Sequence, residues 1–398
     1  MMAKEYLKLH FKNGEAYIRR NRIDQIKRVD GIIFDCDGVL IDVRESYNRA
    51  ISKSAAYILK KMTGFPFPED LFSDEIIHMF RVTGGFNDDW DTVYGIVMFT
   101  LSEMPSEIRE YLAAFIEETG FKSPPISRLR SIEKQWEKVG GNTLDVEFLS
   151  KLVRDLKEFT KLLDSTGRKS VDEKLLRIHG QDADFRRFHI LLKRFLNSRE
   201  VGKSVIATVF EELFCGALLF EEAYRINPAI NTRFGLIENE RLIVKPECLN
   251  SLISMLGRRN LGIASGSRRM PAEYILGELI EKFNPKSLVF AEDVEAAERL
   301  LKKPLKKPHP YSLLKAAEGF GEFRSIIYIG DSMEDAIMAS RAREKMGRII
   351  FAGVYRYTIF EEEMLRIFLK YGCDIILPTV NDLPPVLEML GREKIEDR

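Results

Sequence analysis

The sequence predicts an α/β protein whose doubly wound parallel sheet is interrupted by a mainly α-helical insertion. Three observations support this fold class. The apolar run Gly31-Ile32-Ile33-Phe34 has the length of a buried strand, short apolar runs alternate with helical segments after residue 242, and the stretch between has helical periodicity. A lone strand cannot bury both of its faces, so the strand at 31–34 is expected to join the later ones.

The insertion divides the chain into two expected domains. Residues 1–45 and 240–398 are expected to form an α/β core with an N-terminal hairpin extension, and residues 46–239 a helical cap domain. At 398 residues the chain is long for a single hydrophobic core, which also favours two domains.

The first element is expected to be a β-hairpin. Leu7, Leu9 and Phe11 alternate with polar residues, and Ala16-Tyr17-Ile18 follows on the other side of Asn13-Gly14. An Asn-Gly pair favours the tight turns that join two antiparallel strands.

Helical spacing marks the inserted segment. Ser73 is expected to cap a helix with Ile76, Ile77 and Phe80 that ends at Gly84-Gly85. Two apolar stripes with i, i+3, i+4 spacing are expected to face a core. They consist of Leu149, Leu152, Val153, Leu156, Phe159, Leu162 and Leu163, and of Phe185, Phe188, Leu191, Leu192 and Phe195. The charged segment 168–187 is interpreted as a solvated connection, with a docking surface as the alternative.

Strands return in the last third of the chain. Short apolar runs between helical segments predict parallel strands at 262–264, 288–290, 326–329, 349–351 and 374–377.

The composition disfavours several classes of function. Lys and Arg together number 61, as do Asp and Glu, so no global charge favours a nucleic-acid partner. The four cysteines form no CxxC pair, which disfavours a zinc site or a disulfide framework. No apolar stretch approaches the ~18 residues needed to span a bilayer, and the first ten residues lack the apolar core of a signal peptide. We expect a soluble cytoplasmic protein with no membrane partner, and its oligomeric state stays open.

Two carboxylates follow the first predicted parallel strand. Asp35 and Asp37 project from its carboxyl end, where open α/β sheets place their ligands, and Gly38 permits a sharp turn. Aspartates this close are costly unless a cation compensates their charge. An Asp-x-Asp-Gly motif alone also fits a calcium loop or an ordinary turn.

Further polar groups follow later strands. Ser265-Gly266 offers a hydroxyl and backbone N–H groups to phosphate oxygens, although such a pair is also an ordinary turn. Lys307 precedes a helix expected near Tyr311, and a solvated lysine is the alternative. Asp331 lies at a strand end and Asp335 in the first turn of the following helix, where a capping box is the structural alternative.

One chemistry explains these groups together. Asp35, Asp37 and Asp331 would gather three carboxylates at one sheet edge, and ligation by oxygen alone favours magnesium. Lys307 and the Ser265 turn would neutralise an anion beside it. A carboxylate nucleophile, magnesium and phosphate-binding groups describe phosphoryl transfer through an aspartyl-phosphate.

In these motifs and their order the chain resembles the haloacid dehalogenase superfamily. The resemblance covers residues 30–45 and 240–390 well and the cap only in part. It implies a Rossmann-like core with a mobile cap inserted after the first motif, the arrangement of subfamily I. The segments 42–51, 84–90 and 235–240 look similar to a little-characterised branch of subfamily IA. A charged insertion in the cap and Ser-Gly-Ser in the second motif depart from the usual pattern and leave the substrate undefined.

The resemblance also implies roles for individual residues. Asp35 is then the nucleophile, Asp37 the general acid and base, whose backbone carbonyl also binds metal, and Asp331 completes the magnesium ligands. Asp335 orients Lys307 or a metal-bound water. Ser265, Gly266 and Lys307 hold phosphate.

The activity implied is that of a Mg²⁺-dependent phosphatase for a small sugar or organic-acid phosphate. Asp37 disfavours dehalogenase chemistry, whereas a phosphomutase, a phosphonatase or a non-catalytic binding protein on the same fold stays open. Substrate specificity is expected from the cap residues Arg81, Asn87, Asp88 and Trp90. A tight turn with an aspartate N-cap and a packed tryptophan is the structural alternative there.

Overall fold

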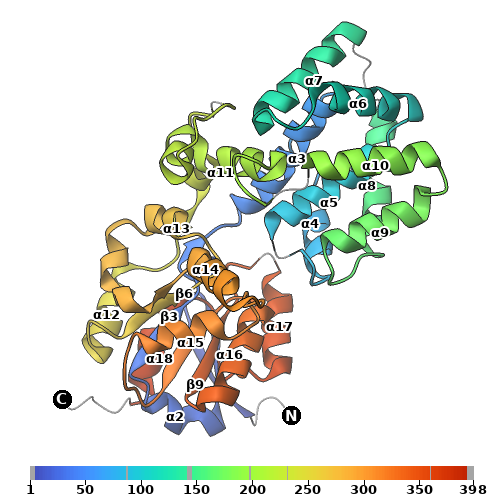
Figure 1. Ribbon diagram of the computed structural model, residues 1–398. Coiled ribbons are helices and arrows are strands. Elements are labelled where there is room, and N and C mark those ends of the chain that lie inside the picture. The colour runs from blue at the N-terminus through green and yellow to red at the C-terminus, as the bar shows by residue number, and fades with distance from the viewer. Residues whose placement is uncertain are drawn as a thin grey trace. The chain divides into compact units, whose positions relative to one another are not determined.

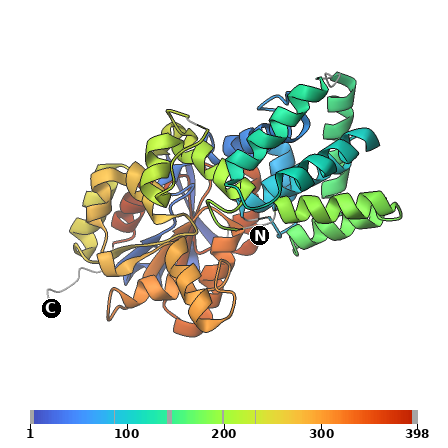
Figure 2. The same ribbon diagram turned by 45° about the horizontal axis from the view of Figure 1, so that its top comes forward.

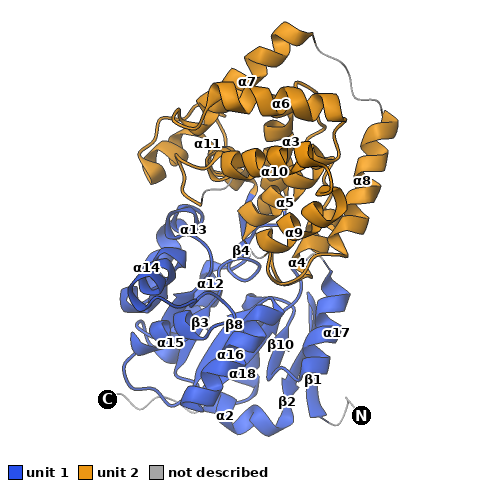
Figure 3. Cartoon of the chain, turned by 45° about the vertical axis from the view of Figure 1, so that its right-hand side comes forward, with its two compact units in different colours: residues 1–44, 240–398 blue, residues 45–239 orange. Residues whose placement is uncertain are grey.

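A computed structural model describes residues 5–86, 88–140, 146–196, 199–230, 232–358 and 360–391. The chain forms two compact units. Unit 1 comprises Met1–Arg44 and Glu240–Arg398, and unit 2 comprises Glu45–Asn239 (Figure 3). The domain limits that we expected from the sequence differ from these by one residue, since Glu45 falls in unit 2.

An eight-stranded sheet forms the centre of unit 1, in the order β1-β2-β10-β9-β8-β3-β6-β7. The strands are β1 (Tyr6–Phe11), β2 (Gly14–Arg19), β3 (Gly31–Phe34), β6 (Leu261–Ala264), β7 (Leu288–Val289), β8 (Ile326–Gly330), β9 (Ile349–Val354) and β10 (Ile375–Leu377). The strands from β10 to β7 in this order pair in parallel, whereas β2 pairs antiparallel with both β10 and β1. The predicted α/β class with a doubly wound parallel sheet is confirmed.

Helices cover both faces of this sheet (Figures 1 and 2). One face packs against α2 (Ile23–Lys27), α12 (Pro246–Leu256), α13 (Arg269–Leu276) and α18 (Leu383–Met389). The other packs against α14 (Ala291–Leu301), α15 (Tyr311–Glu318), α16 (Met333–Met346) and α17 (Glu361–Tyr371). Because both faces are covered, the parallel strands are buried at nearly every position, as their continuous apolar runs require.

The predicted N-terminal hairpin is confirmed, with its turn one residue earlier than expected. Phe11 pairs with Gly14, so Lys12 and Asn13 form the loop. Ile18 pairs with Ile375, which attaches the hairpin to the edge of the parallel sheet at β10.

Short elements complete unit 1. A two-stranded ribbon joins β4 (Ile41–Asp42) to β5 (Arg241–Leu242), close to the points where the chain leaves and re-enters the unit. Short 3₁₀ helices occupy Arg20–Arg22, Gly277–Lys282, Pro285–Ser287 and Val380–Asp382.

Unit 2 is helical in the part that the structure describes. Its helices are α3 (Tyr47–Thr63), α4 (Asp74–Arg81), α5 (Asp89–Ser102), α6 (Ser106–Thr119), α7 (Pro125–Val139), α8 (Val146–Thr160), α9 (Arg168–His179), α10 (Ala183–Leu196) and α11 (Val205–Tyr224), followed by a 3₁₀ helix, Leu236–Asn239. Helix α5 is buried along nearly its whole length and contacts α3, α8, α9, α10 and α11. Unit 2 therefore has a core of its own.

Three details of unit 2 differ from the sequence-based expectations. The Ser73 side chain makes no capping hydrogen bond at the start of α4. Leu162 is half exposed, although the rest of its stripe is buried or partly buried. The charged segment 168–187 is not simply solvated, because the Arg168 guanidinium pairs with buried Asp91 and the Asp172 side chain is also buried.

Among the helices that the structure describes, none combines the length and apolar character required to cross a bilayer.

Candidate active site

Three adjacent strands of unit 1 place their polar residues at one sheet edge. Asp35 follows β3 and donates its backbone N–H to Ile329 O at 2.9 Å. Strand β3 lies between β8 and β6, which are followed by Asp331 and Ser265. Because the three strands are parallel, their carboxyl ends meet at the same edge.

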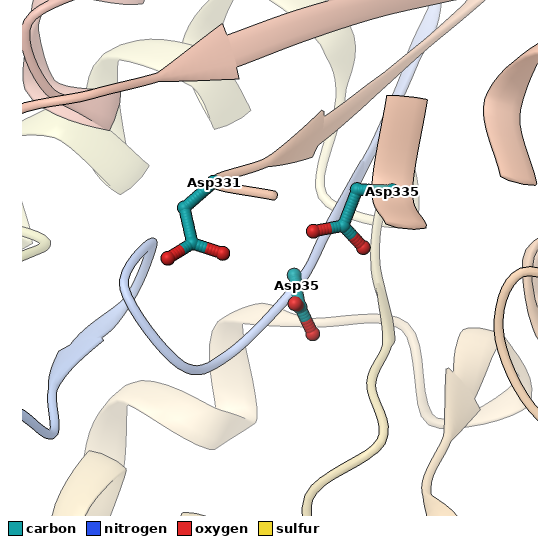
Figure 4. Close-up of side chains that lie close together, drawn as sticks. All are labelled: Asp35, Asp331 and Asp335. Atoms are coloured by element: carbon teal, nitrogen blue, oxygen red, sulfur yellow. The ribbon is translucent and has the colours of Figure 1, made fainter. Parts of the chain in front are cut away.

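The structure brings three carboxylates together at this edge. Asp35, Asp331 and Asp335 each offer one oxygen, and these oxygens lie within 4.8 Å of one another (Figure 4). Asp335 is fully buried and Asp35 is 7% exposed. Carboxylates this close in a buried site repel one another unless positive charge compensates them.

Lys307 supplies part of that positive charge. Its ammonium lies 2.8 Å from Oδ2 of Asp35 and 2.7 Å from Oδ1 of Asp335. The side chain is 13% exposed, so the solvated alternative does not describe it. Burial alone would lower the pKa of Lys307, but the two adjacent carboxylates raise it well above its ordinary value. The lysine is therefore held as a cation.

Each carboxylate oxygen of Asp335 accepts two hydrogen bonds. Its Oδ1 accepts from Lys307 Nζ and from the Tyr328 hydroxyl, each at 2.7 Å. Its Oδ2 accepts from the Ser332 hydroxyl at 2.6 Å and the Ser332 backbone N–H at 3.2 Å. Burial favours the neutral acid, but Lys307 and these hydrogen bonds leave the pKa of Asp335 below its ordinary value. Asp335 is thus an ionised residue that positions Lys307.

The first turn of α16 brings Asp335 to this position. Ser332 is the N-cap and forms a capping box with Asp335. Asp335 therefore has the capping role that was the structural alternative and also lies at the site, as expected. Gly330 at the end of β8 permits the close approach, because a Cβ there would overlap the Asp335 side chain.

Asp331 is the carboxylate that lacks compensation. Among the described residues, no hydrogen-bond donor to its side chain is found, and its pKa is raised well above the ordinary value by burial and by Asp335 and Asp35. Gly38 lies against the Asp331 side chain, with φ +71°, and a Cβ at this position would overlap Oδ2 of Asp331. Only glycine fits there, both for its backbone conformation and for the space.

Asp35 is in contact with groups that favour its charged form. The pKa of Asp35 is nevertheless raised above its ordinary value, chiefly by burial and also by the charge of Asp335, although Lys307 and a hydrogen bond from Ser265 act to lower it. The backbone N–H of Cys36 also donates to its Oδ1 at 2.9 Å. One oxygen of this buried carboxylate contacts the Lys307 ammonium. The carboxylate is suited to act as a nucleophile when a substrate takes the place of that contact.

The Ser265 turn lies beside Asp35. The Ser265 side chain is buried, its hydroxyl lies 2.9 Å from that of Ser267, and it accepts the backbone N–H of Ser267 at 3.1 Å. Gly266 between them is exposed, with no atom within 4 Å of where a Cβ would stand. The turn thus offers an open backbone position next to two hydroxyl groups.

Asp37 lies outside the group of three carboxylates. It is half-buried, bridges to Ile41 through its backbone, and its charge contributes to the raised pKa of Asp331. The carboxylates that lie within 4.8 Å of one another are those of Asp35, Asp331 and Asp335, so the Asp37 carboxylate is not part of the cluster that we expected it to join.

The donor chemistry fits a hard divalent cation. Three carboxylates share the site with one ammonium, so negative charge is in excess there when all three are ionised. Oxygen donors without sulfur or imidazole favour magnesium or a similar ion. Asp35 and Asp331 would hold it, because the oxygens of Asp335 are already occupied by hydrogen bonds.

The four candidate specificity residues of the cap belong to unit 2. Arg81 pairs with Asp89 at 2.9 Å, Asp88 caps α5 by accepting the Trp90 N–H at 3.1 Å, and the buried Trp90 indole donates to Glu211 at 3.1 Å. Asn87 lies outside the described residues. The contacts of Asp88 and Trp90 are those of the structural alternative.

Sequence reasoning missed two members of this site, Tyr328 and Ser267. Tyr328 is fully buried in β8, and its hydroxyl lies 2.7 Å from Asp335 Oδ1 and 3.3 Å from Ala264 O. A lone hydroxyl inside the apolar run 326–329 was the available signal. For Ser267 the signal was the second hydroxyl of Ser-Gly-Ser.

This chain is similar to known proteins in sequence and in structure. Residues 29–343 match the family model of the haloacid dehalogenase-like hydrolases. An X-ray structure of a Northeast Structural Genomics Consortium target is similar at a TM-score of 0.65 with 18% identity, over 91% of this chain and 99% of that one. A phosphatase from Thermococcus thioreducens gives a TM-score of 0.47 with 22% identity, over 86% and 99%. No curated protein matches in sequence.

Proposed function

The chain belongs to the haloacid dehalogenase-like hydrolases, and we propose that it is a phosphatase that hydrolyses a small phosphorylated metabolite through an aspartyl-phosphate on Asp35. One observation carries this proposal. The Lys307 ammonium contacts both Asp35 and Asp335, and an oxygen of the uncompensated Asp331 carboxylate lies within 4.8 Å of an oxygen of each of these two carboxylates. The proposed nucleophile, a cation in a fixed position and a carboxylate that could bind a metal ion therefore lie at one edge of the sheet.

Asp35 is the proposed nucleophile and Asp37 the general acid and base. A carboxylate oxygen of Asp35 attacks phosphorus in line and forms the acyl-phosphate while the leaving alkoxide departs. Asp37 gives a proton to that alkoxide, then takes one from the water that hydrolyses the acyl-phosphate. Asp37 follows Asp35 by two residues, and the proton that it gives to the alkoxide in the first step is replaced by the one that it takes from water in the second, so the cycle needs no other proton source.

The phosphate oxygens are proposed to be held by Lys307, the Ser265 hydroxyl and the backbone at Gly266. Lys307 contacts the proposed nucleophile and has a pKa raised well above its ordinary value, which favours its charged form, and the Gly266 position is open. Fixed donors aimed at the oxygens that gain charge stabilise the transition state without reorganisation.

Magnesium is the proposed cofactor, held by Asp35, Asp331 and the Asp37 backbone. When bound, it would neutralise phosphate charge and orient the phosphoryl group.

The size of the barrier explains why several groups are needed. Uncatalysed phosphate-monoester hydrolysis can require an acceleration of about 10²¹-fold. One general acid contributes roughly 10²–10⁴-fold. The remainder has to come from positioning and charge stabilisation by the other groups.

The substrate is proposed to be a sugar phosphate or an organic-acid phosphate. Unit 2 begins at Glu45, shortly after Asp35 and Asp37 in the chain, and a large insertion at this point favours a small substrate over a macromolecule.

The test is hydrolysis of p-nitrophenyl phosphate with Mg²⁺ by the wild-type chain and by Asp35→Asn, which removes the nucleophilic charge at constant size. We expect turnover in the wild type and none in the variant, whose fold is checked by circular dichroism. Asp24→Asn, at an exposed position of α2, is the matched control. A folded wild type without phosphate release, or an active Asp35→Asn, would contradict the proposal. Chelation by EDTA should abolish turnover reversibly.

A further inference from the structure

Unit 1 contains a cavity of ≈250 Å³ whose lining includes no member of the catalytic group. It lies where α16 and the end of α17 meet β9 and the residues just before β10. Its lining includes Arg19, Ser340, Arg343, Phe351, Tyr371 and Asp374.

The cavity carries an excess of positive charge. The Asp374 side chain is only 1% exposed and is shared by two guanidinium groups, since Arg343 Nη2 donates to Oδ2 and Arg22 Nε lies 3.0 Å from Oδ1. Arg19 donates instead to the neutral carbonyl of Gly372 at 3.0 Å. Among the described residues no carboxylate lies within ion-pair distance of Arg19. Two guanidinium groups, those of Arg19 and Arg343, and one carboxylate line the cavity, and that carboxylate is also paired with Arg22 outside the lining.

The arginines are held before any ligand arrives. Arg343 Nε donates to Ile349 O at 2.7 Å, and this bond together with Asp374 fixes the plane of its guanidinium. Gly372 has φ +84°, and a Cβ there would lie 3.3 Å from Arg19 Nη1, so the backbone approaches the Arg19 side chain closely. A site with ordered side chains loses less rotational freedom on binding.

We propose that this cavity is a second anion site that binds a phosphate-class oxyanion, separately from the catalytic carboxylates. Guanidinium groups match tetrahedral oxyanions through paired N–H donors, and such charge-assisted bonds are stronger than neutral ones. The Ser340 and Tyr371 hydroxyls add donors at the lining, and the half-exposed Tyr371 ring leaves one side open to solvent. The oxyanion is either free phosphate or the phosphate group of a small metabolite.

Calorimetric titration of the full chain in EDTA tests this site without any need for turnover. The titrants are inorganic phosphate and glycerol 3-phosphate. The Lys307→Ala background weakens phosphate binding at the catalytic edge, so binding that persists there belongs to the second site. In that background we expect Arg19→Gln to weaken binding about tenfold or more. Arg20→Gln, which removes the same charge from an exposed neighbour outside the lining, is expected to leave binding unchanged.

The two titrants separate the sources of the anion. Tighter binding of glycerol 3-phosphate supports a phosphorylated metabolite, and equal or weaker binding supports free phosphate. Ser340→Asp provides a second variant on a helix surface, where an added carboxylate should repel either titrant and prevent binding even if Arg19→Gln is poorly folded. Binding that vanishes entirely in Lys307→Ala, or that is unchanged in both Arg19→Gln and Ser340→Asp, would overturn the proposal. Neither result bears on catalysis at Asp35.

Discussion

The ammonium of Lys307 lies 2.7 Å from Oδ1 of Asp335, which follows it by 28 positions in the chain. The same ammonium lies 2.8 Å from Asp35 at the end of β3. One buried cation thus links the strand that carries the proposed nucleophile to the first turn of α16. Because removal of one partner leaves a buried charge unpaired, such contacts are strongly coupled.

Lys307→Ala is expected to lower kcat by about 10²–10³-fold, the loss typical for one donor that stabilises developing charge. The variant should also be less stable, because Asp35 and Asp335 lose their shared partner. Steady-state kinetics with p-nitrophenyl phosphate and a thermal melt measure both effects. Lys303→Ala, an exposed lysine four residues earlier, is the control and should match the wild type. A kcat within about twofold of wild type for Lys307→Ala would rule out the proposed role.

Tyr328→Phe is expected to reduce kcat several-fold while KM changes little. The hydroxyl contacts Asp335 and no predicted substrate group, so its loss loosens Lys307 indirectly. A buried hydrogen bond to a charged group contributes about 1.5–3 kcal/mol. We expect part of this energy to be lost as an increase in the activation free energy of the reaction. Tyr17→Phe removes a hydroxyl bonded to Glu15 on the hairpin and is the control. Equal loss of stability in both variants, with kcat unchanged in Tyr328→Phe, would show a purely structural role.

Gly38→Ala is expected to displace Asp331 and weaken binding of Mg²⁺. The new methyl group would overlap Oδ2 of Asp331, and the backbone has φ +71°. Gly321→Ala isolates the backbone contribution, because Gly321 has φ +76° with no atom within 4 Å of a Cβ. Both variants should lose about 1 kcal/mol of stability or more from strain. Only Gly38→Ala should lose metal affinity by calorimetry, and equal affinity in both variants would contradict the close contact with Asp331.

The strand ends of unit 1 could be predicted because their chemistry is local in sequence. The runs 31–34 and 326–329 carry no charged residue, as strands buried on both faces require; Asp35 follows the first run directly, and Asp331 follows the second after Gly330. Parallel pairing then brings Asp35 and Asp331 to one edge without further information. The capping box at Ser332 and Asp335 also follows from four consecutive residues.

Contacts between distant residues could not be predicted in the same way. In the sequence, Tyr328 resembles the other apolar residues of its strand. Its hydrogen bond to Asp335 depends on the position of α16 in the folded protein. Arg168 lies in a segment whose composition indicates solvent exposure, yet it pairs with Asp91, which lies 77 positions away. A charge pattern reports the average environment of a segment, whereas the partner of one buried charge depends on tertiary packing.

A buried cluster around Asp172 in unit 2 predicts acid sensitivity. Its carboxylate accepts from Tyr94 at 2.7 Å and Lys193 at 2.5 Å and lies 3.3 Å from His189. Burial raises the pKa of Asp172, but these partners lower it below the ordinary value in total. A depressed folded-state pKa gives stability that is present above the unfolded value, about 3.9, and lost as pH falls through the folded value. Asp172→Asn should therefore lower the free energy of unfolding by about 1–3 kcal/mol at pH 6. Its melting temperature should also fall less between pH 5 and pH 2 than that of the wild type. Asp70→Asn, at an exposed position, should keep the wild-type decline, and an identical decline in Asp172→Asn would contradict the assignment.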